Sequence, residues 1–92
     1  MTHPVRAVVW MLVGWLFALS VQALELNQAT EAELDSLRGM GPALNRRVRT
    51  AREVKAFSDW SDFMQRVSGM GRAKAQSFSD QGLTINAQPF QP

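Results

Sequence analysis

The chain has 92 residues, no cysteine, one histidine, and a formal net charge of +2 from ten lysine and arginine residues and eight acidic ones. This length allows one domain with a small core, and the lack of cysteine excludes the disulfide-stabilised class common among secreted domains of this size. The same composition excludes a thiol nucleophile and a soft-metal site, so we predict no enzymatic activity, no metal and no cofactor.

The N-terminal segment has the pattern of an export signal. Arg6 precedes thirteen apolar residues, 7–19, which suit the core of a signal peptide and are too few for a membrane-spanning helix of about 20 residues. Val21 and Ala23 then occupy the −3 and −1 positions of a cleavage site before Leu24. We therefore predict that residues 1–23 are a cleaved signal peptide; the alternative is an uncleaved membrane anchor.

The remaining residues, 24–92, are close to neutral. They contain nine basic and eight acidic residues, for a formal charge of +1, and they lack His3, the only histidine. A domain with this charge cannot attract a polyanion as a general polycation. Since it has no disulfide, helix packing alone must hold it together.

Local signals predict two helices in the first half of this domain. Thr30 and Glu33 have the spacing of a capping box, so a short helix should begin after Thr30 and end before Gly39. Pro42 suits the first position of a second helix, expected to run to about Val54. The residues expected to face the core from these helices are Leu34, Leu37, Leu44, Val48, Ala51, and Val54 or Lys55.

Two further helices are predicted in the second half. Ser58 or Asp59 can cap a third helix that stops at Gly69, and a fourth should run from Arg72 to about Asp80. The residues expected to face inward from the third helix are Trp60, Phe63, Met64 and Val67. Residues 83–85 should pack back across the core, so the domain is expected to be all-α over residues 24–86, with a flexible tail at 87–92.

The tripeptide Gly-Met-Gly occurs twice, at residues 39–41 and 69–71, each time between two predicted helices. The surrounding segments, LRGMGPALNRRV and VSGMGRAKAQSF, resemble the two hairpins of the tandem helix-hairpin-helix family. The flanking sequences LNQATEAEL, the aromatic loop FSDW and the final GLTIN also resemble the ComEA-type competence domain. The resemblance covers nearly all of residues 26–86.

This resemblance implies two helix-hairpin-helix units related by a pseudo-twofold axis. It also implies sequence-independent binding of double-stranded DNA by its phosphate backbone. The implied setting is DNA uptake across a Gram-negative envelope, with the protein in the periplasm, or anchored in the inner membrane facing the periplasm, as a receptor or ratchet. Further partners would be an inner-membrane DNA channel or an outer-membrane uptake pore.

The physical basis of such a site is an anion-binding turn. Glycine at both ends lets the main chain adopt conformations closed to other residues and removes side chains that would keep a phosphate away. Neighbouring N–H groups then lie beside the positive end of the next helix. Met40 and Met70 are expected to fix the turns by insertion into the core. The residues predicted to form the DNA-binding site are Gly39, Met40, Gly41, Ala43, Arg46, Arg47, Gly69, Met70, Gly71, Arg72, Ala73 and Lys74.

Charge placement separates this interpretation from a helix corner that binds no ligand. The cations near the starts of the second and fourth helices are Arg46, Arg47, Arg72 and Lys74. A cation at a helix N-terminus is disfavoured by about 0.3–1 kcal/mol, and an incoming phosphate would reverse that cost. The other two helices begin with acids, as expected when no anion binds.

Several nearby residues have two interpretations. Arg49 and Arg52, expected to share the exposed side of the second helix with Asn45, either extend the basic track or are ordinary solvated surface. Arg38 stands where the family often has proline, and either contacts a phosphate or points to water. Pro42 lacks an N–H group, so the second turn is expected to bind more strongly than the first.

The alternative function is an exported scaffold that binds protein. Extrinsic subunits of photosystem II resemble the same fold without acting on DNA, so the fold alone does not decide. Base-excision glycosylases also contain such hairpins, but a domain of about 70 residues is too small to enclose a base pocket as well as a core.

Trp60 is expected in the core because of its helical spacing to Phe63 and Met64.

Overall fold

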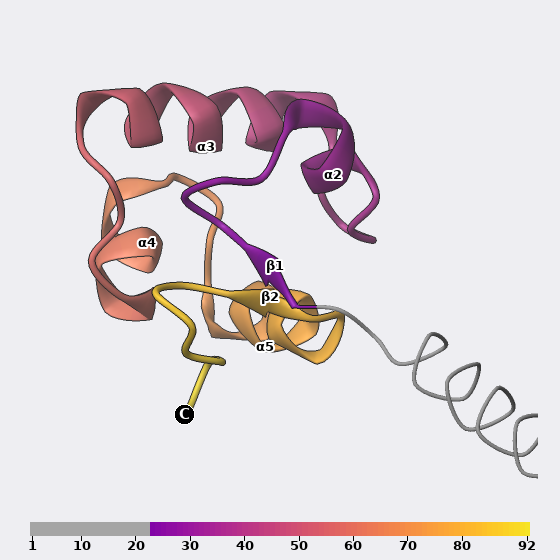
Figure 1. The fold of residues 1–92 in the computed structure, drawn as a ribbon, viewed down its shortest axis with the longest axis vertical. Helices are drawn as coiled ribbons and strands as arrows, with labels where there is room; N and C mark the ends of the chain where they lie inside the picture. Colours follow the sequence, from indigo (N-terminus) through magenta and orange to yellow (C-terminus); the bar gives the residue numbers. More distant parts are fainter. Residues whose placement is uncertain (1–22) are drawn as a thin grey trace, which may run out of the picture.

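The computed structural model describes residues 23–92 (Figure 1). The elements in chain order are β1 (Leu24–Glu25), α2 (Glu31–Asp35), α3 (Pro42–Val54), α4 (Trp60–Arg66), α5 (Arg72–Asp80) and β2 (Leu83–Thr84). The predicted signal peptide therefore lies outside the described residues except for Ala23. Within residues 23–92, no helix is both long and apolar enough to cross a membrane.

The predicted helix boundaries are confirmed, and local hydrogen bonds explain them. The Thr30 hydroxyl accepts the N–H of Glu33 at 3.1 Å, and the Glu33 carboxylate accepts the N–H of Thr30 at 2.9 Å, which completes the capping box of α2. The Asp59 carboxylate caps α4 by accepting the N–H of Asp62 at 2.7 Å. After α5, Gly82 has a φ of +105°, the left-handed conformation that glycine adopts most readily.

The structure adds a two-stranded parallel sheet that the all-α prediction lacked. β1 and β2 pair in the register Leu24↔Leu83 and Glu25↔Thr84. Figure 1 shows the two strands side by side next to α5, so the first and last parts of the domain meet there. Strands of two residues are too short to show an alternating hydrophobic pattern, which is why the sequence did not reveal them.

One apolar core contains side chains from each helix described and from the segments beside the strands. The apolar faces expected for the helices are confirmed, except at the end of α3, where Val54 is 83% exposed. At 100° per residue, Val54 lies about 80° around the helix from Leu44, at the edge of the buried stripe. The last turn of α3 therefore presents an apolar side chain to solvent.

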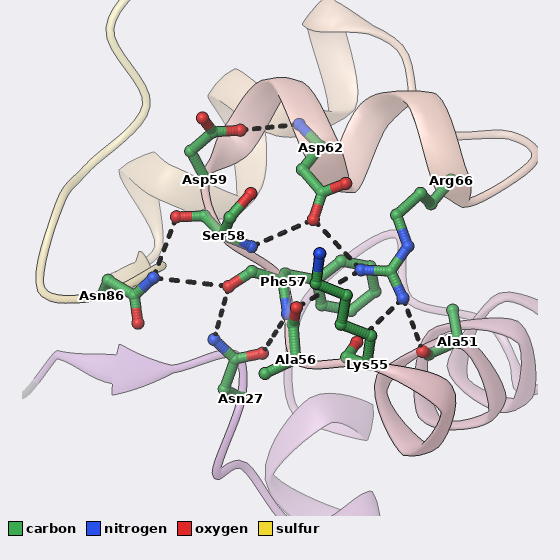
Figure 2. Close-up of polar contacts among 10 residues, drawn as sticks. All are labelled: Asn27, Ala51, Lys55, Ala56, Phe57, Ser58, Asp59, Asp62, Arg66 and Asn86. Carbon is green, nitrogen blue, oxygen red and sulfur yellow. Dashed lines mark hydrogen bonds and ion pairs between the residues drawn. The ribbon is translucent and has the colours of Figure 1, made fainter.

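Phe57 fixes the connection between α3 and α4, as Figure 2 shows. Its N–H donates to Oδ1 of Asn27 at 2.8 Å and its carbonyl accepts from Nδ2 of Asn27 at 2.9 Å. The buried ring packs edge-on against Phe63, with centroids 5.0 Å apart. The guanidinium of Arg66 lies 4.6 Å from the centroid of the Phe57 ring.

Arg66 also ends α3, a role that the sequence analysis did not identify. Its Nη2 donates to the carbonyl oxygens of Ala51 at 2.7 Å and Lys55 at 2.8 Å (Figure 2). Its Nη1 donates to Asp62 at 3.0 Å within α4. The carbonyl of Lys55, at the C-cap, lies beyond the hydrogen bonds of the helix, and the carbonyl of Ala51 accepts Arg66 in addition to the N–H of Lys55 at 3.2 Å. This one side chain therefore both caps α3 and holds α4 against it.

The segment expected to be a flexible tail makes specific contacts with the domain. The indole N–H of Trp60 donates to the carbonyl of Gln88 at 2.9 Å, and the buried ring of Phe90 packs edge-on against Trp60 at 5.5 Å. The N–H of Phe90 donates to the hydroxyl of Ser79 at 2.9 Å. Residues 87–90 therefore cover one end of the core.

Glu25 holds the turn that precedes this segment. Asn86 and Ala87 have φ values of +50° and +66°, a conformation that non-glycine residues seldom adopt. The carboxylate of Glu25 accepts both of their N–H groups, at 2.6 and 3.0 Å, and the Thr84 hydroxyl at 3.0 Å. Partial burial raises the pKa of Glu25, but the hydrogen bonds to its charged form outweigh this effect and lower the pKa below the usual 4.5.

The first prediction is acid sensitivity that depends on Glu25. A carboxyl group with a lowered pKa in the folded state stabilises the fold above its unfolded pKa, and this contribution is lost as the pH falls through the folded pKa. The free energy of unfolding, measured by urea denaturation, should therefore decrease below about pH 5. In Glu25→Gln, the free energy of unfolding should decrease less steeply over this range. A pH dependence equal to that of the unaltered protein would contradict the role of this carboxylate.

The second prediction concerns Arg66. Arg66→Met keeps a long side chain against Phe57 but leaves carbonyl groups of α3 without their charged donor. Chemical denaturation should show a loss of about 1.5–3 kcal/mol in the free energy of unfolding. Arg46→Met, at an exposed position without an ion pair among the described residues, is the matched control and should change it by less than about 0.5 kcal/mol. Equal effects of the two substitutions would argue against the capping role.

Candidate functional site

The two Gly-Met-Gly turns repeat the same backbone geometry. In the first turn, residues 37–41, the N–H of Met40 donates to the carbonyl of Leu37 at 3.1 Å. In the second turn, residues 67–71, the N–H of Met70 donates to the carbonyl of Val67 at 3.2 Å. The burial predicted for both methionines is confirmed, since their side chains are 6% and 5% exposed. These side chains therefore hold the turns to the core.

Only the first glycine of each turn needs the conformational freedom expected for both. Gly39 and Gly69 have φ values of +94° and +91°, where a side chain is strained. Gly41 and Gly71 have φ values of −75° and −101°, which any residue can adopt. The second glycine is instead the N-cap of the following helix, so the expectation of positive φ at both ends was wrong.

The helices that follow the turns begin with open N-termini. Gly41 and Gly71 provide no side-chain cap, and neither α3 nor α5 has an acid in its first turn. No atom outside the adjoining chain lies within 4 Å of a Cβ built on either glycine. The N–H groups at the start of a helix lack intrahelical partners, so an anion can reach them here. Pro42 leaves α3 with one N–H fewer than α5.

The four predicted cations are exposed. The ion pairs found within residues 23–92 join Arg49 to Glu31 and Arg66 to Asp62, so none of the four is engaged in one. The four are Arg46, Arg47, Arg72 and Lys74. Those on α5 lie in its first turn, whereas those on α3 are its fifth and sixth residues and lie in its second turn. The dipole argument for unfavourable cation placement therefore holds for α5 and not for α3.

The side chain of Arg47 extends from α3 to the second turn. Its Nη2 is 3.3 Å from the position that a Cβ would occupy on Gly69. A groove of about 350 Å³ continues from there along α3, lined by Arg46, Arg47, Thr50, Ala51, Val54, Arg66, Val67 and Ser68. The second turn thus has cations from both α3 and α5, which no local sequence signal could have shown.

Three other polar residues of α3 have structural contacts. Asn45, expected on the exposed side, is 1% exposed; its Nδ2 donates to the carbonyl of Glu31 and to the carboxylate of Asp35. The Nε of Arg49 donates to Oδ1 of Asn45 at 2.8 Å. The residue Arg52 donates to two carbonyl oxygens in residues 26–29, at 2.8 and 2.7 Å. Neither Arg49 nor Arg52 is therefore a free extension of the basic track.

The remaining candidates have simple positions. Ala43 and Ala73 are exposed second residues of α3 and α5, where their small side chains leave the helix starts accessible. Trp60 is buried, as predicted. Within residues 23–92, no three acidic or histidine side chains converge in a way that could hold a metal ion.

Comparisons with protein-family models, with curated proteins and with solved structures gave no match to this chain. The function is therefore inferred from the motifs and from the geometry above. That geometry consists of two equivalent turns, open helix starts behind them, and exposed cations gathered most densely at the second turn.

The third prediction separates the two glycines of the second turn. Gly69→Ala forces a side chain into the strained positive-φ region and against Arg47, so urea denaturation should show a loss of about 1–3 kcal/mol. Gly71→Ala meets open space at a permitted φ, and should leave the free energy of unfolding within about 0.5 kcal/mol of its original value. A large loss from Gly71→Ala would show that the turn geometry described here is wrong.

Proposed function

We propose that this chain is an exported protein of the tandem helix-hairpin-helix type that binds double-stranded DNA through its phosphates without regard to sequence. The observation that carries this proposal is the coupling of each Gly-Met-Gly turn to an open, acid-free helix start. Among the helices of residues 23–92, α2 and α4 have side-chain caps and acids in the first turn, so only the starts of α3 and α5 are left free for an anion.

Each turn would bind one phosphate group. The phosphate oxygens would accept N–H groups from the turn and from the first residues of α3 or α5, at the positive end of the helix. At the second turn, Arg72 and Lys74 on α5 and Arg47 from α3 add charge-assisted contacts to neighbouring phosphates of the duplex. Met40 and Met70 contribute by fixing the turns from the core, and not by contact with DNA.

Sequence independence follows from the groups available. Backbone N–H groups and flexible cationic side chains recognise phosphates, which are the same for every base pair. The near-neutral charge of residues 24–92 means that affinity would come from the two local sites and not from a general positive field. The second turn, with a complete set of N–H groups and cations from two helices, would contribute more than the first.

The biological setting rests on the resemblance to the ComEA-type competence domain. After export, the protein would act in the periplasm as a receptor or ratchet that retains incoming DNA, handing it to an inner-membrane channel. An outer-membrane pore would supply the DNA. A membrane-anchored form facing the periplasm would act in the same way.

A second candidate function is protein binding by an exported scaffold. One observation favours it: Val54 is 83% exposed and lines the groove beside the second turn, where an apolar side chain of a partner could bury it. Titration with DNA discriminates between the two candidates, since a scaffold has no need to respond to phosphates.

The fourth prediction is the salt dependence of DNA binding. If Arg46, Arg47, Arg72 and Lys74 each neutralise one phosphate, binding releases about four counterions, and log K against log salt concentration should have a slope of about −3 to −4. Fluorescence anisotropy with duplexes of two unrelated sequences should give the same slope and similar affinity.

Single substitutions test which cations take part. Lys74→Ala should make the slope less negative by about one. Lys55→Ala is the matched control, because Lys55 is also exposed but is the C-cap of α3, at the negative end of that helix and not at an open helix start. Salt-insensitive binding, strong sequence preference, or equal effects of the two substitutions would contradict the phosphate-binding mechanism.

A further inference from the structure

The first turn is held by the end of α5, the helix that begins at the second turn. The residue after α5, Gln81, lies against the residues immediately before Gly39. Two segments 43 residues apart in the chain are joined there. The contact therefore links the two turns through one helix.

The side-chain amide of Gln81 binds both polar backbone groups of Arg38. The N–H of Arg38 donates to Oε1 of Gln81 at 2.8 Å, and Nε2 of Gln81 donates to the carbonyl of Arg38 at 3.1 Å. The same Nε2 donates to the Ser77 hydroxyl at 3.2 Å, which keeps the amide aligned with α5. Since Arg38 directly precedes Gly39, this pairing holds the backbone at the point where φ becomes positive.

The ring of Phe78 supports the turn from the same helix. It is fully buried, and its Cε1 lies 3.4 Å from the position of a Cβ on Gly39. One side of the first turn thus packs on an apolar ring of α5, and its preceding residue is hydrogen-bonded to the end of α5. Van der Waals contact with a ring does not fix the orientation of the turn, whereas the directional hydrogen bonds with Gln81 do.

We propose that Gln81 is a positioning residue for DNA binding: by clamping Arg38, it sets the first turn at a defined distance from the second. This inference rests on the proposed function. α5 has nine residues and is therefore about 13 Å long, with the second turn at its start and the clamp at its end. The helix acts as a spacer between two phosphate sites.

The spacing matters because the phosphates of a duplex are fixed relative to one another. Two weak sites on one domain reinforce each other only if both can be occupied at once, since the second contact is then intramolecular. Without the clamp, the first turn can still form but is no longer held where a phosphate lies when the second turn is engaged. The duplex would then be held mainly by the second turn.

The test replaces Gln81 with methionine, which has a similar length and no amide. Gln81→Met should weaken DNA binding about tenfold and make the salt slope less negative by about one, because a phosphate contact of the first turn is lost. Gln65→Met is the matched control, since within residues 23–92 the Gln65 amide bonds only to Ser61 of its own helix, α4. The affinity and salt slope of this variant should equal those of the unaltered protein. A merely destabilising role would leave the slope of the folded protein unchanged.

A second measurement does not depend on DNA. Hydrogen exchange of the Arg38 N–H should be faster in Gln81→Met and unchanged in Gln65→Met. If Gln81→Met fails to fold, as judged by circular dichroism, Gln81→Asn replaces it, since its shorter side chain cannot reach both groups of Arg38.

The outcomes are distinct. If the unaltered protein binds DNA and Gln81→Met binds with the same affinity and slope, the positioning role is overturned and the proposed function stands. Unchanged Arg38 exchange in that variant would likewise overturn the clamp. If the unaltered protein does not bind DNA, the proposed function fails and the positioning role fails with it, whatever the exchange of Arg38.

Discussion

The arrangement of the domain depends on how Phe57 is held. This residue lies in the short connection from α3 to α4. The course of that connection places α4, and with it the second turn, relative to α3 (Figure 1). The Asn27 side chain forms hydrogen bonds with the N–H and the carbonyl of Phe57. Arg66 lies over the Phe57 ring and donates to carbonyl groups at the end of α3 (Figure 2). The polar backbone groups of Phe57 and the end of α3 thus have hydrogen-bond partners, and the Phe57 ring is covered. Within residues 23–92, no buried side-chain nitrogen or oxygen lacks a hydrogen-bond partner.

A similar device recurs at Arg38, where Gln81 takes the place of Asn27. In both cases a side-chain amide pairs with the N–H and carbonyl of one residue, as a neighbouring strand would. A domain of about 70 residues without disulfides has few apolar contacts with which to orient its connections. Directional hydrogen bonds from partly buried amides provide that orientation, and both act beside segments that the proposed function requires to be rigid.

The candidate site shows how much can be read from local sequence. Its repeated turns, open helix starts and cations were all predicted, because each is a signal within a few residues. The positions of the cations relative to the two turns were not predicted. Arg47 reaches the second turn from α3, and Arg49 binds Asn45 and Glu31. These contacts form because the fold brings together side chains that are distant in the chain. The net charge of the domain says little about either turn.

The sequence by itself determined where the helices begin and end and which of their faces are mainly apolar. Caps, Pro42 and glycines act on adjacent backbone groups, so their effect does not depend on the rest of the fold. Only the tertiary structure decided that Asn45 is buried, that Val54 is exposed, and that two short parallel strands join the ends of the domain. It also decided the role of Arg66. These features depend on contacts between segments far apart in the chain, whose energies no local pattern encodes.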